Sequence, residues 1–330
     1  MATALFRPGD RPLLNLALVL LTLGTTFATF LYAFEGVALD GSLGASALQL
    51  RAAATFALCT VAILGAHEMG HYVLARLHGV DSSLPYFIPL PLLGFGTLGA
   101  VIRLRGPIPT RNALVDIGAA GPLAGLAVAL PVLFWGFREA AVVDAAPLVR
   151  DFPGSDSLWS LALELVASLT GWGGAGAPLE EAGYTRQLMV FGEPLLMDAV
   201  RYLALGPLPA GKDVMMSAPM LAAWFGLLVT LLNLMPVGQL DGGHVAFAVL
   251  GRHARRVGQA VAVGLLLLAV FVQWTWVVWL LLAGKLIGFH HPPVLEPREP
   301  LSPGRRLVSA LCLLALVGCA MPVPLALVLE

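Results

Sequence analysis

Two histidines and one glutamate stand close together in the segment GAHEMGHYVL, which is otherwise largely apolar. His67 and His71 are four positions apart, so on a helix their imidazoles lie on one face, one turn apart. Both can then bind the same metal ion, while Glu68 beside them can act as a general base toward water. The HExxH pattern therefore predicts a hydrolytic zinc site, with His67 and His71 as ligands and Glu68 as the base.

The composition of the chain makes this placement unusual. Of the 330 residues, 58% are hydrophobic and 12% are charged, whereas soluble proteins carry about 25% charged residues. The net charge of −1 argues against a nucleic-acid partner, which would require a basic patch. The composition indicates a membrane protein. Placing an ionisable side chain at the bilayer centre costs about 2.5–3.5 kcal/mol, so such a residue is functional by default. A purely structural role for His67, Glu68 and His71, as hydrogen-bonded core residues, is therefore the weaker interpretation.

A hydrolytic zinc site commonly has three protein ligands and an open fourth position. The segment LLNLMPVGQLDGGH offers Asp241, which follows Pro236 in a glycine-rich stretch. An Asp-Gly pair on its own indicates a turn, but beside an HExxH pattern Asp241 becomes the leading carboxylate candidate. Asn233 and Gln239 can donate to a substrate carbonyl, although hydrogen bonding at a helix end explains them equally well.

The elements that must position these residues are transmembrane helices. A span needs about 20 predominantly apolar residues, and six segments meet this requirement. We therefore predict an all-α polytopic membrane protein, with residues 1–330 forming a single integral membrane domain. The expected spans are residues 13–34, 52–75, 112–137, 216–235, 257–282 and 307–329.

Two segments between these spans do not fit a membrane helix. Residues 84–106 are apolar but broken by prolines and glycines, so we expect a re-entrant loop or a short β-hairpin with residues 97–103 extended. Residues 138–215 carry ten acidic and five basic side chains and are expected to form an external insertion. Within it, residues 157–170 and 193–205 are typical of amphipathic interfacial helices.

Arginines in short loops predict the orientation, because such loops lie in the cytoplasm. By this count the region of residues 76–111 and the group Arg252, Arg255 and Arg256 are cytoplasmic, which places the metal site near that side. Arg305 and Arg306 fall on the opposite side and do not fit the count. No long transit peptide precedes the first span, which favours a bacterial cytoplasmic (inner) membrane.

The two motifs together resemble the site-2 protease family of intramembrane zinc metalloproteases. HEMGH in one span is followed in a later one by N-x-x-P-x-x-x-x-D-G, and the segments FIPLPLLGFGTLGAVIRLRG and LLVTLLNLMPVGQLDGGH resemble the branch with chloroplast-type members and bacterial relatives. The resemblance covers most of residues 50–330. It implies a zinc endopeptidase that cleaves transmembrane segments of membrane proteins, with one Zn²⁺ per chain held by His67, His71 and Asp241 and water activated by Glu68.

The resemblance also implies roles for residues outside the ligand set. Asn233 matches an asparagine expected to contact the substrate backbone, and a Gly-Pro element implies a kink or close packing beside the catalytic helices. The loop of residues 96–99 is expected to offer a strand edge to an unwound substrate, or else simply to cover the site. No PDZ domain is seen, so control is expected from membrane segments, the insertion or a regulatory membrane partner. The residues concerned are Gly96, Thr97, Leu98 and Gly99 for substrate binding, and Gly121, Pro122, Gly125 and Pro236 for structure.

Other functions and roles stay open at this stage. An intramembrane metal or proton transporter could use the same His, Glu and Asp cluster, although the inverted repeats typical of transporters are not seen. A catalytically inactive membrane scaffold is a third alternative. Asp116 is expected to pair with Arg111, and His244 is expected to be either an interfacial histidine or a residue that supports the metal ligands.

Overall fold

The computed structural model describes residues 11–35, 37, 45–144, 158, 162, 187–281, 288, 294–296 and 299–329. Within them, four helices are long and apolar enough to cross a membrane by length and composition. Ala218–Leu234 (α6) is apolar but has 17 residues. The predicted polytopic membrane protein is thus confirmed, while six spans are not. The four are Pro12–Ala33 (α1), Ala47–Leu77 (α2), Arg111–Glu139 (α3) and the stretch Asp241–Phe271, which Gly251 divides into two helices.

Hydroxyl side chains begin several of these helices. The Ser46 side chain accepts from the backbone N–H of Gln49, and the Gln49 side chain returns a bond to Ser46, which forms a capping box at the start of α2. The side chains of Thr110, Ser217 and Ser302 each accept from a backbone N–H in the first turn of the helix that follows, without the returning bond. These bonds satisfy backbone donors that the helix leaves free.

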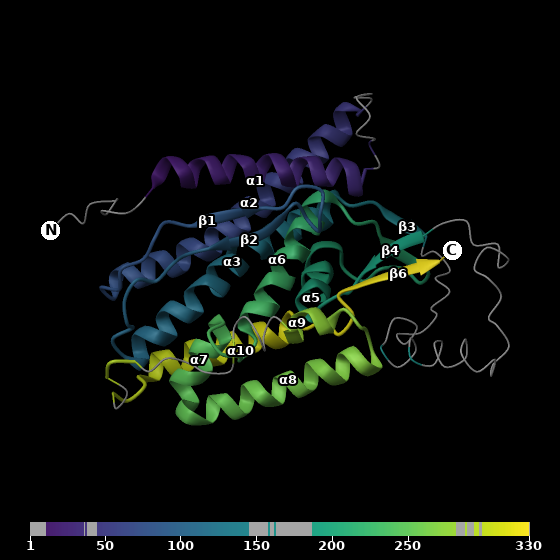
Figure 1. The fold of residues 1–330 in the computed structure, drawn as a ribbon. Helices are drawn as coiled ribbons and strands as arrows, with labels where there is room; N and C mark the ends of the chain where they lie inside the picture. Colours follow the sequence, from purple (N-terminus) through teal and green to yellow (C-terminus); the bar gives the residue numbers. More distant parts are fainter. Residues whose placement is uncertain are drawn as a thin grey trace.

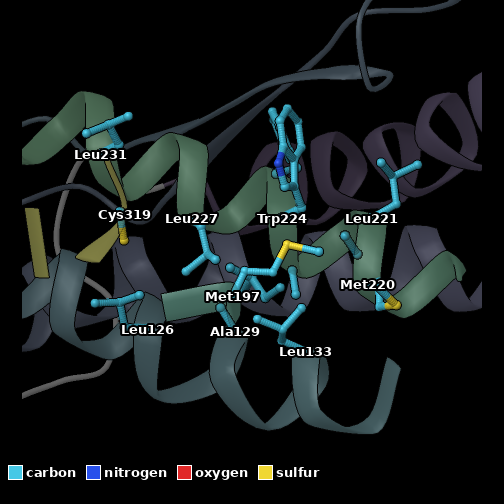
Figure 2. Close-up of a cluster of buried hydrophobic side chains, with 14 of the residues drawn as sticks. Leu126, Ala129, Leu133, Met197, Met220, Leu221, Trp224, Leu227, Leu231 and Cys319 are labelled. Carbon is cyan, nitrogen blue, oxygen red and sulfur yellow. The ribbon is translucent and has the colours of Figure 1, made fainter. Parts of the chain in front are cut away.

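Helices α2, α3 and α6 pack together at the centre of the molecule (Figure 1). Figure 2 shows the contact between α3, which contributes Leu126, Ala129 and Leu133, and α6, which contributes Leu227 and Trp224. The Trp224 indole N–H donates to the Gly192 carbonyl at 2.7 Å, so its polar atom has a partner despite complete burial. This apolar core holds α2, and with it the HExxH residues, in a fixed position.

A β-hairpin lies in the segment 84–106, so the structure takes the second of the two predicted forms. Tyr86–Pro89 (β1) pairs antiparallel with Thr97–Val101 (β2), and α1 lies along β1 (Figure 1). Three α1 side chains bind the hairpin: Thr25 Oγ1 donates to the Gly96 carbonyl at 2.8 Å, Asn15 Nδ2 donates to the Pro85 carbonyl at 2.7 Å, and Thr29 Oγ1 accepts from the backbone N–H of Leu92 at 3.1 Å. The polar side chains of α1 therefore hold the hairpin against the bundle.

The last two predicted spans are wrong in their extent. The segment 257–282 is not one helix, because Ala254–Phe271 (α8) ends before Gln273, whose side chain donates to the Leu325 carbonyl, and Trp276–Leu281 (α9) follows as a separate helix. The segment 307–329 is helical only within Pro303–Gly318 (α10). Pro322 and Pro324 stop the helix, and Leu325–Leu329 (β6) instead pairs with Gln187–Phe191 (β4).

The insertion of residues 138–215 is described only in part. Val142–Asp144 (β3) pairs with Lys212–Val214 (β5) just beyond the end of α3. Leu195–Leu205 (α5) lies in the predicted helical segment 193–205 and buries Met197, Val200 and Ala204. The other predicted helix, residues 157–170, lies outside the described residues except for two positions.

Arg305 lies at the same end of the molecule as the C-terminal end of α2. Its guanidinium binds Asp116 of α3 at 2.7 Å, and Asp116 also binds His78, which follows α2, at 2.9 Å. The prediction that Asp116 pairs with Arg111 is wrong, because five residues along a helix place the two side chains on different faces. The expectation that Arg305 falls on the opposite side from the other arginines is corrected as well.

Candidate metal centre

The structure brings His67, His71 and Asp241 together. Nε2 of His67 lies 3.3 Å and Nε2 of His71 lies 3.2 Å from Oδ2 of Asp241, and the two Nε2 atoms are 3.2 Å apart. Both histidines are buried in α2, one turn apart, as the spacing predicts. Among the described residues, they form the one cluster of three or more His, Cys, Asp or Glu side chains able to hold a metal ion.

The triangle of ligand atoms has the dimensions of three corners of a zinc tetrahedron. With zinc–ligand bonds of about 2.0–2.1 Å, the ligand atoms of a tetrahedral site lie about 3.3–3.4 Å apart. Direct hydrogen bonds between charged groups would be shorter, at about 2.7–2.9 Å. Two imidazoles and one carboxylate are also a typical set of ligands for a catalytic zinc. The donor set therefore fits zinc.

The His71 ring is held in the orientation that a ligand requires. Its Nδ1 lies 2.7 Å from the carbonyl oxygen of Ile117 in α3. An N–H at Nδ1 donates to that oxygen and leaves the lone pair on Nε2, which faces Asp241. Ile117 acts through its backbone, so no side-chain pattern in the sequence indicates this role.

Small residues of α3 make room for the two rings. A Cβ atom at Gly121 would overlap the His71 ring, and one at Gly125 would lie 3.3 Å from Nδ1 of His67. Gly118, which sequence analysis missed, lies against His244 and the backbone of Asp241. Pro122 lies inside α3, which continues through it, so close packing is the arrangement seen around the Gly-Pro element.

A tight turn between α6 and Asp241–Leu250 (α7) brings Asp241 back to the histidines. Pro236 lies in this turn, and Asp241 is the first residue of α7, where the helix dipole favours a carboxylate. A Cβ atom at Gly242 would overlap the Leu234 carbonyl, and one at Gly243 would overlap the Gly238 carbonyl. The two glycines after Asp241 are therefore required for the close return of the chain.

A cavity of about 260 Å³ opens beside the three ligands. Glu68 and Asn233, both predicted site residues, lie in its wall together with Gln239 and His244. The strand side of the wall consists of Ala100, Val101, Ile102 and Leu104.

The predicted loop of residues 96–99 does not line this cavity. Gly96 packs against the backbone of α1, and the Thr97 hydroxyl donates to the Ile88 carbonyl within the hairpin. The Leu98 side chain is 67% exposed. Instead, Ile102, just after β2, lines the cavity together with Glu68, the candidate base.

The helices and the His-His-Asp cluster define a polytopic membrane protein with a candidate metal centre. Residues 55–273 match the family described as peptidase family M50, which is more than half of the chain. The chain belongs to peptidase family M50, and the resemblance to site-2 proteases is confirmed.

Curated relatives are named as metalloproteases. The chain is 33% identical over 226 residues to a protein of Oryza sativa subsp. indica named probable zinc metalloprotease EGY2, chloroplastic, a match that covers 67% of this chain and 34% of the relative. It is 30% identical over 203 residues to the Arabidopsis thaliana protein named probable zinc metalloprotease EGY1, chloroplastic, with 62% of this chain and 31% of the relative covered. The chain thus spans about a third of the length of these relatives. No solved structure matches it.

Proposed function

We propose that this protein is an intramembrane zinc endopeptidase that cleaves transmembrane segments of membrane proteins. The observation that carries the proposal is the convergence of His67, His71 and Asp241 on one point, beside Glu68 in the same cavity. Two of these ligands lie in a helix long enough to cross a membrane. Family membership and the relatives' names, which specify zinc, support the same reaction.

The residues of the cavity have different roles in hydrolysis. His67, His71 and Asp241 would hold a zinc ion, which would supply a Lewis acid to polarise the scissile carbonyl and to lower the pKa of water toward neutrality. Glu68 takes the proton from the attacking water and delivers it to the leaving amine. Asn233 donates its side-chain amide to the substrate backbone and so fixes the peptide in the cavity.

A substrate helix must unwind before its peptide bonds can be attacked, because its own hydrogen-bond ladder hides them. The two-stranded sheet leaves β2 with one edge that pairs with no other strand among the described residues. Ala100, Val101 and Ile102 extend this strand into the wall of the cavity. The unwound substrate adds to the chain here as a further strand, a few residues beyond the loop that the sequence indicated.

The metal site faces the cytoplasmic side of a bacterial cytoplasmic membrane in this proposal. The arginine count supports the orientation, because Arg111, Arg255 and Arg305 belong to helix starts that lie at one end of the molecule with the end of α2. The relatives are named as chloroplastic. In a chloroplast membrane the metal site would have the same position relative to the lipid bilayer.

Zinc analysis tests the ligand set. The purified parent protein should contain one zinc ion per chain, and His67→Ala and Asp241→Ala should each lose it. His253→Ala is the matched control, because His253 is exposed on the surface outside the cavity, and it should keep its zinc. Zinc retained in Asp241→Ala would separate the two motifs and refute the three-ligand site.

Proteolysis tests the reaction itself. Glu68→Gln should keep its zinc and its fold while losing cleavage of a single-span membrane protein reconstituted with it in liposomes. Full cleavage by this variant would remove Glu68 from the mechanism. Zinc flux through the parent protein in liposomes without any peptide cleavage would instead support a transporter.

A further inference from the structure

A second, larger cavity lies behind α7, on the side away from the metal ligands. It has a volume of about 530 Å³, and its lining residues come from α7, α10, the start of α8, the end of α6 and the turn after α6. Apolar side chains form nearly all of its wall, among them Pro236, Val245, Val249, Leu313 and Leu316. A groove of this size is typical of small-molecule binding sites.

One charged side chain stands in the wall of this groove. Arg306, in the first turn of α10, is exposed, and its guanidinium has no hydrogen bond or ion pair among the described residues. None of the described residues that line the groove is acidic. Val257 at the start of α8 also lines the groove. The groove is thus apolar, with one basic side chain, Arg306, in its wall.

We propose that this groove binds an anionic phospholipid, with one acyl chain between α7 and α10 and the headgroup phosphate on Arg306. The stretch Asp241–Phe271, which contains α7 and α8, is a candidate membrane span by length and composition, so we expect the groove to open toward lipid tails, the apolar molecules available at that depth. An arginine guanidinium matches a phosphate in charge and in its fork of donors. The other apolar occupant available in a membrane is a transmembrane helix. It is about 10 Å wide and would need a broader groove than an acyl chain does.

The groove lies directly behind a metal ligand. Gly242, the neighbour of Asp241, lines the groove, while Asp241 itself lines the metal cavity. An acyl chain in the groove supports the back of α7 and fills a space that would otherwise be void. The bound lipid is therefore a structural partner of the metal-bearing segment.

Lipid binding by the purified protein tests this site. The protein in mild detergent is titrated with phosphatidylglycerol or with phosphatidylcholine carrying the same acyl chains, and the complexes are counted by native mass spectrometry. The parent should bind phosphatidylglycerol about fivefold more tightly than phosphatidylcholine, the preference that one basic residue provides at an anionic headgroup. Arg306→Gln should remove this preference. Arg51→Gln, whose side chain is 74% exposed in a different helix, should keep it.

A second pair of variants tests the groove. Ala310→Phe fills the space between α10 and α7 and should weaken the binding of both lipids, while Leu314→Phe, on the exposed face of α10, should leave both unchanged. Equal binding of the two lipids by the parent, or an unchanged preference in Arg306→Gln, would overturn the proposal. Glu68→Gln should bind phosphatidylglycerol as the parent does, so the result does not depend on whether the protein cleaves peptides.

Discussion

The substitution Gly121→Ala probes how closely α3 packs against the metal site. The added methyl group would overlap the His71 ring at its Nε2 side, and the ring cannot turn freely because its Nδ1 is bound to the Ile117 carbonyl. Overpacking of this kind costs about 1–3 kcal/mol. Since the strain falls on a ligand atom, zinc affinity should decrease by about 5- to 150-fold, at about 1.4 kcal/mol for each factor of ten.

Two further glycines provide a graded series. At Gly125 the new Cβ would lie 3.3 Å from Nδ1 of His67, so a shift of a few tenths of an ångström relieves the contact, and the loss should be less than about fivefold. At Gly264 no atom lies within 4 Å, and alanine should leave zinc affinity unchanged. Affinity is measured by competition with a chromophoric chelator, and helical content by circular dichroism of the metal-free forms.

Zinc affinity should be lowest for Gly121→Ala, intermediate for Gly125→Ala and equal to the parent for Gly264→Ala. Alanine is favoured over glycine inside a helix by about 0.5–1 kcal/mol, so all three metal-free forms should keep their helical content. If Gly121→Ala binds zinc as tightly as the parent, or if Gly264→Ala loses as much affinity, then α3 does not control the position of the His71 ring.

Two other substitutions test the elements around the site. Asp116→Asn removes a mostly buried carboxylate from Arg305 and should lower the free energy of unfolding by about 1–2 kcal/mol, seen as a lower midpoint of thermal unfolding. Asp198→Asn, in a more exposed ion pair, should lower it by less than about 1 kcal/mol. Equal losses would show that the Asp116–Arg305 pair is no more important to stability than the exposed pair. Phe95→Ala removes the ring at the hairpin tip that packs against Phe34, which follows α1, Phe56 of α2 and Phe225 of α6. Hydrogen exchange in residues 86–101 should therefore accelerate. Phe134→Ala, 43% exposed in α3, is the control, and unchanged exchange after Phe95→Ala would show that the tip does not anchor the hairpin.

Local spacing made most of the ligand set predictable. Four residues on a helix fix the relative position of His67 and His71 whatever the fold around them. Asp241 is far away in the sequence, and only the need for a third ligand, together with the Pro-Gly context and the family resemblance, pointed to it. Gly242 and Gly243 belong to the same sequence context. Glycine is required at both positions because a chain that returns this closely has no space for side chains.

The elements that could not be predicted depend on tertiary contacts. Hydrophobicity alone does not distinguish a helix from a strand in residues 325–329, and the signal that sequence analysis passed over was the pair Pro322 and Pro324. The structure places Ala100, Val101 and Ile102, and not residues 96–99, in the wall of the cavity. That position depends on how α1 holds Gly96 through Thr25, and no local pattern encodes it.

Helix α3 contributes no predicted ligand and no predicted base. It nevertheless contacts nearly every part of the candidate site. Through its backbone α3 orients His71 at Ile117, and through Gly121 it leaves space for the ring. Its first residue, Arg111, donates to the carbonyls of Ala248 and Val249 at the end of α7, the helix that begins with Asp241. The family resemblance indicated Gly121 and Gly125 of α3, whereas the Ile117 carbonyl oxygen that orients His71 leaves no trace in a side-chain pattern. We therefore expect small changes in α3 at Ile117 and Gly121 to alter the metal centre although α3 supplies no ligand.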